Sequence, residues 1–295
     1  MLRLLTVAAL MIAAAARAEP FANGIPRAEN VLQTREGRIF ISSRQGLHEL
    51  VPREGAWERW DFPMPGDCRV LGLAEQADML YAAAQCPAGR RDGQGAFLYA
   101  LNLTGDAAAF TEIAALPGVA QPNGLAAHGD GDLYLADSGS LTAQGALYRL
   151  RMTAGGLQQQ VVQGTASTRP NGVRIDGNRI YLSINPPAYV GPSRLVRHEL
   201  GENGLSDPVE LLRSYAFIDD FALVEGGVLV TRLFAGRIDY ITEDGQPRHS
   251  VSVLMPSSVA LGRPPIEAGS LLVTALFPGS LMRLRPEWAP GLRPR

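Results

Sequence analysis

Short apolar segments alternate with turns rich in Gly, Asp and Asn along most of the chain. Residues 121–138 (QPNGLAAHGDGDLYLADS) form one such unit, with a polar turn, a short strand, a Gly/Asp turn and a second strand. The same order of residue types returns at 169–185 (RPNGVRIDGNRIYLSIN) and, more loosely, at 218–232. Asn123, Asn171 and Asp219 stand 48 positions apart in these three copies. A period in the forties with several short strands predicts propeller blades.

Three further units fit the same template less closely. Glu29-Asn30 precedes the apolar segment 39–41, and Ser257-Ser258 precedes 271–274. Residues 70–73 precede Leu80-Tyr81 but contain no polar pair. No segment after residue 18 has a long helical period, which disfavours a parallel βαβ sheet. We therefore predict an all-β fold, a six-bladed β-propeller with four-stranded antiparallel blades, as a single domain over residues 19–295. The strand that closes the ring is not evident from the sequence.

The first eighteen residues have the pattern of a secretory signal peptide. A short basic start with Arg3 precedes an apolar run over 4–15, which is too short to span a bilayer. Ala16-Arg17-Ala18 supplies a small-x-small cleavage site, so we predict cleavage before Glu19. A retained membrane anchor is the alternative. Cleavage implies an exported protein, periplasmic or extracellular, without membrane attachment.

Composition and charge narrow the functional classes. The chain has 295 residues, 46% hydrophobic, with 32 Gly and 21 Pro that suit many tight turns. Loss of Arg3 and Arg17 with the signal peptide changes the formal net charge from −2 to −4. A mildly acidic surface without a basic stripe argues against nucleic-acid binding. We expect a monomer with a small-molecule substrate.

Cys68 and Cys86 are the two cysteines of the chain. They precede and follow consecutive strands of the second unit, so a hairpin can bring them together. In an exported protein this pattern predicts a disulfide, with two buried free thiols as the alternative.

Equivalent positions of successive blades face one central axis, so the polar pairs should meet at one mouth of the channel. Carboxylate and amide oxygens are hard donors that suit Ca²⁺, Mg²⁺ or Mn²⁺. The four histidines do not share a position in the repeat, which disfavours a His-rich zinc site. Asp137 and Asn185 end the second strands of their units, where they either line the same mouth or cap turns. The converging pairs are Glu29-Asn30, Asn123-Gly124, Asn171-Gly172, Asp219-Asp220 and Ser257-Ser258.

The order and spacing of these motifs resemble the gluconolactonase/regucalcin-like six-bladed β-propellers over essentially the whole mature chain. The resemblance rests on Glu29-Asn30, the two Pro-Asn-Gly motifs at 122–124 and 170–172, Asp219-Asp220-Phe221 and Ser257-Ser258-Val259. It implies a divalent metal held by Glu29, Asn171 and Asp219, with Asp220 as the rival for the last position. Ca²⁺ is the first expectation, with Mg²⁺, Mn²⁺ or Zn²⁺ as alternatives.

The resemblance further implies hydrolysis of a lactone or related small ester. Asp219 or Asp220 would be the catalytic base, and Asn123 would contact the substrate, with Asp137 and Asn185 as further candidate substrate contacts. The chain has no Gly-x-Ser-x-Gly motif, so a serine hydrolase fits poorly. Gln121 and Gly124 replace the Arg and Asp that flank the substrate Asn in the family's lactonases. This departure favours the alternative, a non-catalytic periplasmic propeller that binds a small ligand or a protein.

Overall fold

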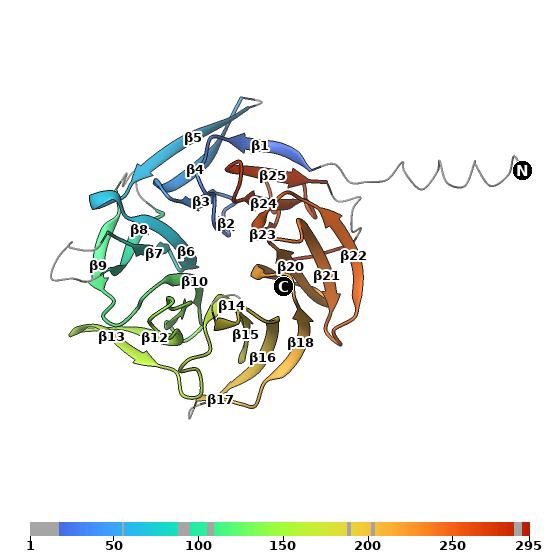
Figure 1. The fold of residues 1–295 in the computed structure, drawn as a ribbon. Coiled ribbons are helices and arrows are strands. Elements are labelled where there is room, and N and C mark those ends of the chain that lie inside the picture. The colour runs from blue at the N-terminus through green and yellow to red at the C-terminus, as the bar shows by residue number, and fades with distance from the viewer. Residues whose placement is uncertain are drawn as a thin grey trace, which may run out of the picture.

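The computed structural model describes residues 18–54, 56–87, 95–104, 109–187, 190–201, 204–285 and 291–295. These residues form six antiparallel sheets arranged as blades around a central axis (Figure 1), which confirms the predicted six-bladed β-propeller. Apart from the 3-10 helix η1 (Pro65–Asp67), the named elements are all strands. No helix in the described part of the chain is long and apolar enough to span a membrane. The predicted signal peptide lies outside the described residues except for Ala18.

Each blade runs from an inner strand at the axis to an outer strand at the rim, in the order of the chain. The first blade contains β2 (Val31–Gln33), β3 (Ile39–Ser43), β4 (Gly46–Arg53) and β5 (Ala56–Pro63). The second contains β6 (Arg69–Gln76), β7 (Met79–Gln85), β8 (Ala96–Asn102) and β9 (Thr111–Ala115). The third contains β10 (Pro122–Ala127), β11 (Leu133–Asp137), β12 (Ala146–Thr153) and β13 (Gly156–Val161).

The fourth blade has an additional short strand. It contains β14 (Pro170–Asp176), β15 (Arg179–Ile184), β16 (Ser193–Gly201), β17 (Gly204–Leu205) and β18 (Val209–Ser214), and both β17 and β18 pair with β16. The fifth contains β19 (Ile218–Val224), β20 (Gly227–Arg232), β21 (Arg237–Thr242) and β22 (Pro247–Ser252). The sixth contains β23 (Pro256–Leu261), β24 (Leu271–Ala275) and β25 (Ser280–Leu284).

The N-terminal strand β1 (Glu19–Asn23) closes the ring. It pairs antiparallel with β25 and supplies the fourth, outermost strand of the sixth blade, with Glu19 opposite Arg283 and Asn23 opposite Ser280. Phe21 on β1 also packs edge-on against Trp57 of the first blade, with 5.2 Å between ring centroids. The segment Glu19–Asn23 therefore joins the last blade to the first.

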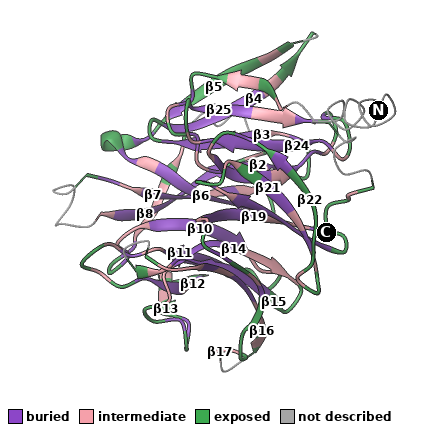
Figure 2. Cartoon of the chain, turned by 45° about the vertical axis from the view of Figure 1, so that its right-hand side comes forward, coloured by how far each residue is buried: buried purple, intermediate pink, exposed green. Residues whose placement is uncertain are grey.

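The hydrophobic core is a ring of six clusters, one at each boundary between neighbouring blades. Phe40 of the first blade meets Phe97 of the second in one cluster, and Ile41 meets Leu272 of the sixth blade in another. Both faces of the middle strands are consequently buried (Figure 2). This explains why these strands read as apolar runs rather than as strict alternation.

In four of the six blades, a serine or threonine hydroxyl on the second strand connects the inner strand to the next blade. Ser183 accepts a hydrogen bond from the Gly172 amide at 2.7 Å and donates one to the Asp219 carbonyl at 3.1 Å. Thr231 repeats this between Asp220 and Ser257, Thr274 between Ser258 and Glu29, and Ser42 between Asn30 and Leu71. These bonds fix the backbone of the residues that open the inner strands.

The second and third blades use glycine at this place instead. Ala83 and Ala136 occupy the positions that serine or threonine has in the other blades. The inner strands instead bring Gly72 and Gly124 against the backbone of the next blade. A Cβ on Gly124 would lie 2.6 Å from the Asn171 carbonyl oxygen, and one on Gly72 would overlap the Asn123 carbonyl. Close approach of the backbones therefore requires glycine at both positions.

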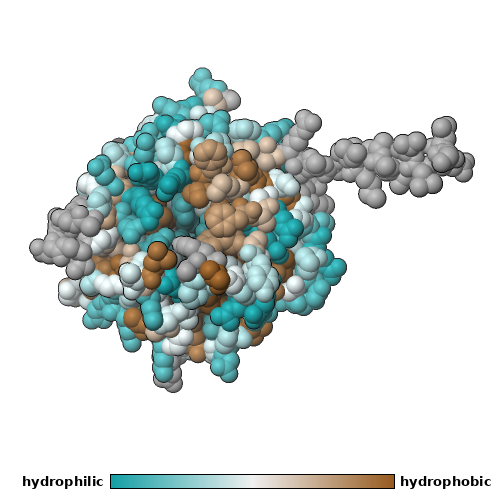
Figure 3. Space-filling model, in the orientation of Figure 1, coloured by the Kyte–Doolittle hydropathy of each residue, from teal (hydrophilic) through white to brown (hydrophobic). Residues whose placement is uncertain are grey.

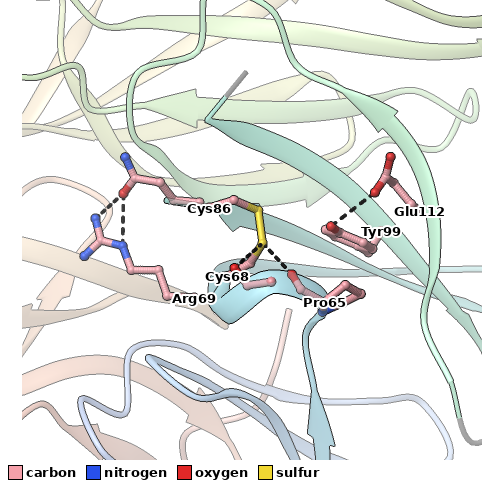
Figure 4. Close-up of a disulfide and its surroundings, with 8 residues drawn as sticks. Pro65, Cys68, Arg69, Cys86, Tyr99 and Glu112 are labelled. Atoms are coloured by element: carbon pink, nitrogen blue, oxygen red, sulfur yellow. Dashed lines mark hydrogen bonds between the residues drawn. A yellow bond between two sulfur atoms is a disulfide. The ribbon is translucent and has the colours of Figure 1, made fainter. Parts of the chain in front are cut away.

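Cys68 and Cys86 form a disulfide, as predicted from their spacing (Figure 4). Cys68 follows η1 and precedes β6, and Cys86 follows β7, so the bond ties the start of the inner strand to the end of its neighbour. The adjacent Arg69 donates from Nε to Gln85 Oε1 at 3.0 Å, and Gln85 Nε2 donates to the Ala120 carbonyl at 2.8 Å. This part of the second blade is thereby attached to the third.

Candidate metal and catalytic site

Six residues occupy equivalent positions around the axis, where the inner strands begin. Four of them are Glu29, Leu71, Asp219 and Ser257. The backbone carbonyl of each accepts a hydrogen bond from the serine or threonine hydroxyl of the preceding blade, which places the four residues in one layer. Asn123 and Asn171 complete this layer through the close contacts of their carbonyls with Gly72 and Gly124. We call these six residues the first ring. The second blade contributes Leu71, which agrees with the missing polar pair in its sequence.

A local irregularity of the inner strands positions these side chains. In β10, β14 and β19 the pairing register shifts between Pro122 and Leu125, Pro170 and Val173, and Ile218 and Phe221. Asn123, Asn171 and Asp219 each lie within such a bulge. A β-bulge redirects side chains and is common beside functional sites. The Pro-Asn-Gly motifs therefore mark the start of a bulged strand rather than a free turn.

Asp219 is the centre of the polar contacts in the first ring. The hydroxyl of Ser257 donates to Asp219 Oδ2 at 2.8 Å, and the Asn171 side chain is hydrogen-bonded to the same carboxylate. Asp219, Asn171 and Ser257 are all buried. The structure thus brings together the fourth, fifth and sixth blades at one carboxylate, and the charge of Glu29 from the first blade also acts on it.

Both acids of the ring hold protons more tightly than free carboxyls do. Burial raises the pKa of Glu29 from 4.5 to about 7; Arg69 and Arg27 oppose this shift, and the charge of Asp220 adds to it. Burial, followed by the negative charge of Glu29, raises the pKa of Asp219 well above its usual value, although hydrogen bonds from Ser257 and Asn171 favour its charged form. Glu29 therefore acts on Asp219, and Asp220 acts on Glu29, so that three acids lie close together where burial disfavours their charged forms.

A divalent cation fits this donor set. Two carboxylates and an amide oxygen are hard ligands, and a cation between them would balance the charge that the protein leaves uncompensated. Among the described residues, no three His, Cys, Asp or Glu side chains lie close enough to bind a metal without other donors. Donors other than carboxylates would therefore have to complete the site, and the Asn171 amide is one of those in the first ring. The absence of a histidine or cysteine from the first ring suits Ca²⁺, Mg²⁺ or Mn²⁺ better than Zn²⁺.

Asp220 points to different partners. Its Oδ2 accepts from Arg174 Nη2 at 2.5 Å and from Ser258 Oγ at 2.6 Å, whereas its buried Oδ1 has no hydrogen-bond partner within the described structure. A Cβ on Gly172 would lie 2.7 Å from this Oδ1. Asp220 is thus in an ion pair next to the first ring, whereas Asp219 is a member of the ring.

Asp137 and Asn185 are engaged in backbone and blade contacts. Asp137 is fully buried, and its carboxylate accepts from the amides of Gln121 at 2.8 Å and Gly139 at 2.9 Å. Asn185 donates to the Ile218 carbonyl at 3.2 Å and accepts from Ser193 Oγ at 2.6 Å. Of the two roles considered for these residues, this geometry favours capping of turns. Asn123 is buried in the first ring beside Asn171.

A second layer of side chains lies two residues before the first ring, and the sequence analysis did not identify it. Arg69 contacts Gln85 as described above, Arg169 Nη2 donates to the Ser140 carbonyl at 2.6 Å, and Arg27 is close enough to lower the pKa of Glu29. Counting back two positions from each polar pair would have found this layer. We call it the second ring; it consists of Arg27, Arg69, Gln121, Arg169, Phe217 and Met255.

The opposite end of the channel contains a separate cavity of about 340 Å³. It is lined by the later residues of the inner strands, among them Arg174, and by the C-terminal residues Pro294 and Arg295. Arg295 Nη1 pairs with Asp176 at 3.3 Å and bonds the Tyr181 hydroxyl at 3.2 Å. None of the polar members of the first ring lines this cavity, so the C-terminus occupies the mouth that is remote from the candidate site.

The comparisons with known proteins show the fold. No family model matches the chain, and no curated protein matches it in sequence. Among solved structures, a luciferin-regenerating enzyme has a TM-score of 0.70 at 15% identity, with 95% of this chain and 97% of that chain covered. A gluconolactonase from Xanthomonas campestris has a TM-score of 0.65 at 17% identity, with 91% and 89% covered.

A third similar structure has a different activity. The PQQ-bound aldose sugar dehydrogenase from Streptomyces coelicolor has a TM-score of 0.64 at 14% identity, with 92% of this chain and 98% of that chain covered. The expected likeness to gluconolactonase and regucalcin-like propellers is therefore confirmed for the fold. Because one propeller architecture serves several chemistries, function has to be argued from the site.

Proposed function

We propose that the chain is a divalent-metal-dependent hydrolase of a lactone or related small ester. The observation that supports this most is the convergence of Glu29, Asn171 and Asp219 from three blades, with the pKa of both acids raised by burial. Buried acids with perturbed pKa values are more common at functional sites than in structural positions. The similarity in fold to a gluconolactonase is consistent with the proposal.

The residues have separable roles in this proposal. A cation held by Glu29, Asn171 and Asp219 would supply Lewis-acid polarisation of the substrate carbonyl. The Asp219 carboxylate takes a proton from water as the water oxygen bonds the carbonyl carbon; the ring C–O bond then breaks, and the proton passes to the leaving alkoxide. Asn123, which lies beside Asn171 in the first ring, orients the lactone.

Metal binding is the first test. Thermal unfolding of the protein in EDTA is compared with unfolding after addition of Ca²⁺, Mg²⁺ or Mn²⁺, together with metal analysis of the purified protein. A cation bound by the folded state alone adds about 2.7 kcal/mol at a hundred times its Kd, which raises Tm by several degrees. No response to any of these ions would contradict the metal site.

Catalysis is tested with Asp219→Asn on a panel of lactones. This variant keeps an oxygen donor but loses the base, so we expect the rate of hydrolysis to fall by about 10² to 10⁴. Asp207→Asn, at an exposed position after β17, is the matched control and should retain full activity. Unchanged metal-dependent hydrolysis in Asp219→Asn would reject Asp219 as the base.

The alternative function is a propeller that binds a ligand without catalysis. It is favoured by Gln121 and Gly124, which stand where the family's lactonases have Arg and Asp. A protein that binds lactones in calorimetry but hydrolyses none of them, with metal present, would establish this alternative.

A further inference from the structure

The second ring is polar on one side and apolar on the other. Arg27, Arg69, Gln121 and Arg169 belong to the first four blades, whereas Phe217 and Met255 belong to the fifth and sixth. The members other than Arg27 are partly buried, at the end of the channel where the inner strands begin. A molecule that reaches Glu29 and Asp219 from this end of the channel would have the blades with the arginines on one side and the blades with Phe217 and Met255 on the other.

The apolar side continues outward on the loops of the same face. Within a blade, the loop between the second and third strands and the connection to the next blade both lie at the end where the inner strands begin. The six most exposed large hydrophobic residues of the described chain all lie in these connections and are 63% to 87% exposed; they are Leu141, Val190, Tyr215, Phe234, Leu254 and Phe277. The other four lie within strands and are at most 48% exposed.

Phe234 connects the exposed loops to the second ring. It lies in the turn between β20 and β21, and its ring is 5.7 Å from that of Phe217 in the second ring. Figure 3 looks onto this face and shows brown, hydrophobic side chains gathered to the right of its middle, with teal, hydrophilic side chains to the left. Four of the six exposed residues, Tyr215, Phe234, Leu254 and Phe277, lie in connections into or within the fifth and sixth blades, whereas Leu141 and Val190 lie in loops of the third and fourth. The larger part of the apolar surface is therefore next to the blades that supply Asp219 and Ser257.

We propose that the substrate carries an apolar substituent, aliphatic or aromatic, beside its reacting carbonyl, so that an alkyl- or aryl-substituted lactone fits better than a polyhydroxylated sugar lactone. This inference rests on the proposed function, which places the carbonyl at the first ring. The substituent would then lie along Phe217, Phe234 and Leu254. Hydroxyl groups in that position would lose hydrogen bonds to water without gaining partners, whereas methylene groups would gain from burial.

The test is a series of lactones that share the γ-butyrolactone ring and carry alkyl chains of increasing length. Their binding is measured by calorimetry on the protein that begins at Glu19, with Ca²⁺ present. γ-Butyrolactone, γ-hexalactone, γ-octalactone and γ-decalactone are compared with glucono-δ-lactone, and hydrolysis of each is followed in parallel. We expect affinity to rise about two- to fourfold for each methylene that reaches the apolar side. Glucono-δ-lactone should bind more weakly than γ-decalactone.

Two variants locate the substituent. Phe234→Ser and Leu254→Ser should flatten the dependence on chain length and leave the affinity for γ-butyrolactone unchanged. Val209→Ser removes an exposed apolar side chain from the outer strand β18 and should leave the whole series unchanged. Two independent positions are used so that a folding defect in one variant, visible as a lower Tm, does not decide the result.

The outcomes separate this inference from the proposed function. Affinity that is independent of chain length, or chain-length dependence that both variants retain, overturns the inference even if lactones are hydrolysed. Chain-length-dependent binding without hydrolysis supports the inference and rejects the catalytic proposal. No binding and no hydrolysis of any of these lactones overturns both.

Discussion

At the scale of single residues, the two acids of the first ring oppose folding when they are ionised. Burial opposes the ionisation of both Glu29 and Asp219; the charge of Glu29 adds to this at Asp219, and the charge of Asp220 adds to it at Glu29. Ser257 and Asn171 offset part of this cost for Asp219 through hydrogen bonds. Acids that lower the stability of the folded state in this way are common at functional sites.

Glu29→Gln should therefore stabilise the metal-free protein at alkaline pH. The pKa of Glu29 is about 7 in the folded state against an ordinary value of 4.5, so the folded state binds more protons between these values. Its stability falls as the pH rises from about 4.5 to 7, and the loss is complete above that range. The variant lacks this loss. We expect a gain of at most about 3 kcal/mol at pH 8, less if the accessible part of Glu29 is screened by solvent, and none near pH 4.

The measurement is denaturant unfolding in EDTA at both pH values. Glu36→Gln changes an exposed acid in the turn after β2 and is the control, with no expected difference between the two pH values. The same Glu29→Gln protein should lose the stabilisation by Ca²⁺. A variant that is less stable than the wild type at pH 8 in EDTA would contradict the assignment of Glu29 as an uncompensated acid.

At the scale of elements, the blades hold their inner strands in two different ways. Four blades use a serine or threonine hydroxyl to fix the start of the inner strand, and the second and third blades use close backbone contact at Gly72 and Gly124. The second blade also has the disulfide between Cys68 and Cys86. A covalent bond thus supports a blade that lacks the hydroxyl.

Loss of this disulfide should destabilise the whole propeller. Cys68 and Cys86 are 18 residues apart, and closing a loop of that size is worth about 3 kcal/mol in the chain-entropy model. We expect the double variant Cys68→Ala, Cys86→Ala to lose about that much in equilibrium urea unfolding. Wild-type protein in reducing agent should behave in the same way, and the variant itself should not respond to reductant. Equal stability of oxidised and reduced wild type would show that the bond contributes nothing.

At the scale of the whole molecule, stability depends on closing the ring between the two ends of the chain. β1 covers the edge of β25 and packs Phe21 against Trp57 of the first blade, while the C-terminal residues bond the fourth and fifth blades. Without β1, the sixth blade would have three strands and an exposed edge, which is a known route to aggregation.

Removal of residues 1–23 should therefore open the ring. Compared with a protein that begins at Glu19, the shorter protein loses the ladder of hydrogen bonds to β25 and the Phe21 contact. At about 1 kcal/mol for each hydrogen bond, we expect a loss of several kcal/mol in thermal or urea unfolding. Light scattering should show association through the free β25 edge. A monomer of unchanged Tm would mean that the blades close without β1.

The sequence by itself determined the six blades and the polar residues from which the first ring is built. The 48-residue period and the polar pairs predicted the architecture because strand and turn preferences are local, and a repeat places equivalent residues at equivalent distances from the axis. For this reason Glu29, Asn171 and Asp219 could be named as neighbours although they lie in different blades. The disulfide was predictable on similar grounds, since both cysteines flank a single hairpin.

Only the tertiary structure decided which residue of each polar pair belongs to the first ring. Bulges at the start of the inner strands separate Asp219 from Asp220, and the hydrogen bonds of Asp137 and Asn185 indicate turn and blade contacts rather than channel-lining positions. The closing strand pairs residues about 260 positions apart, and the second ring combines side chains from all six blades. Such features depend on the direction of each side chain and on long-range pairing, and neither leaves a local pattern in the chain.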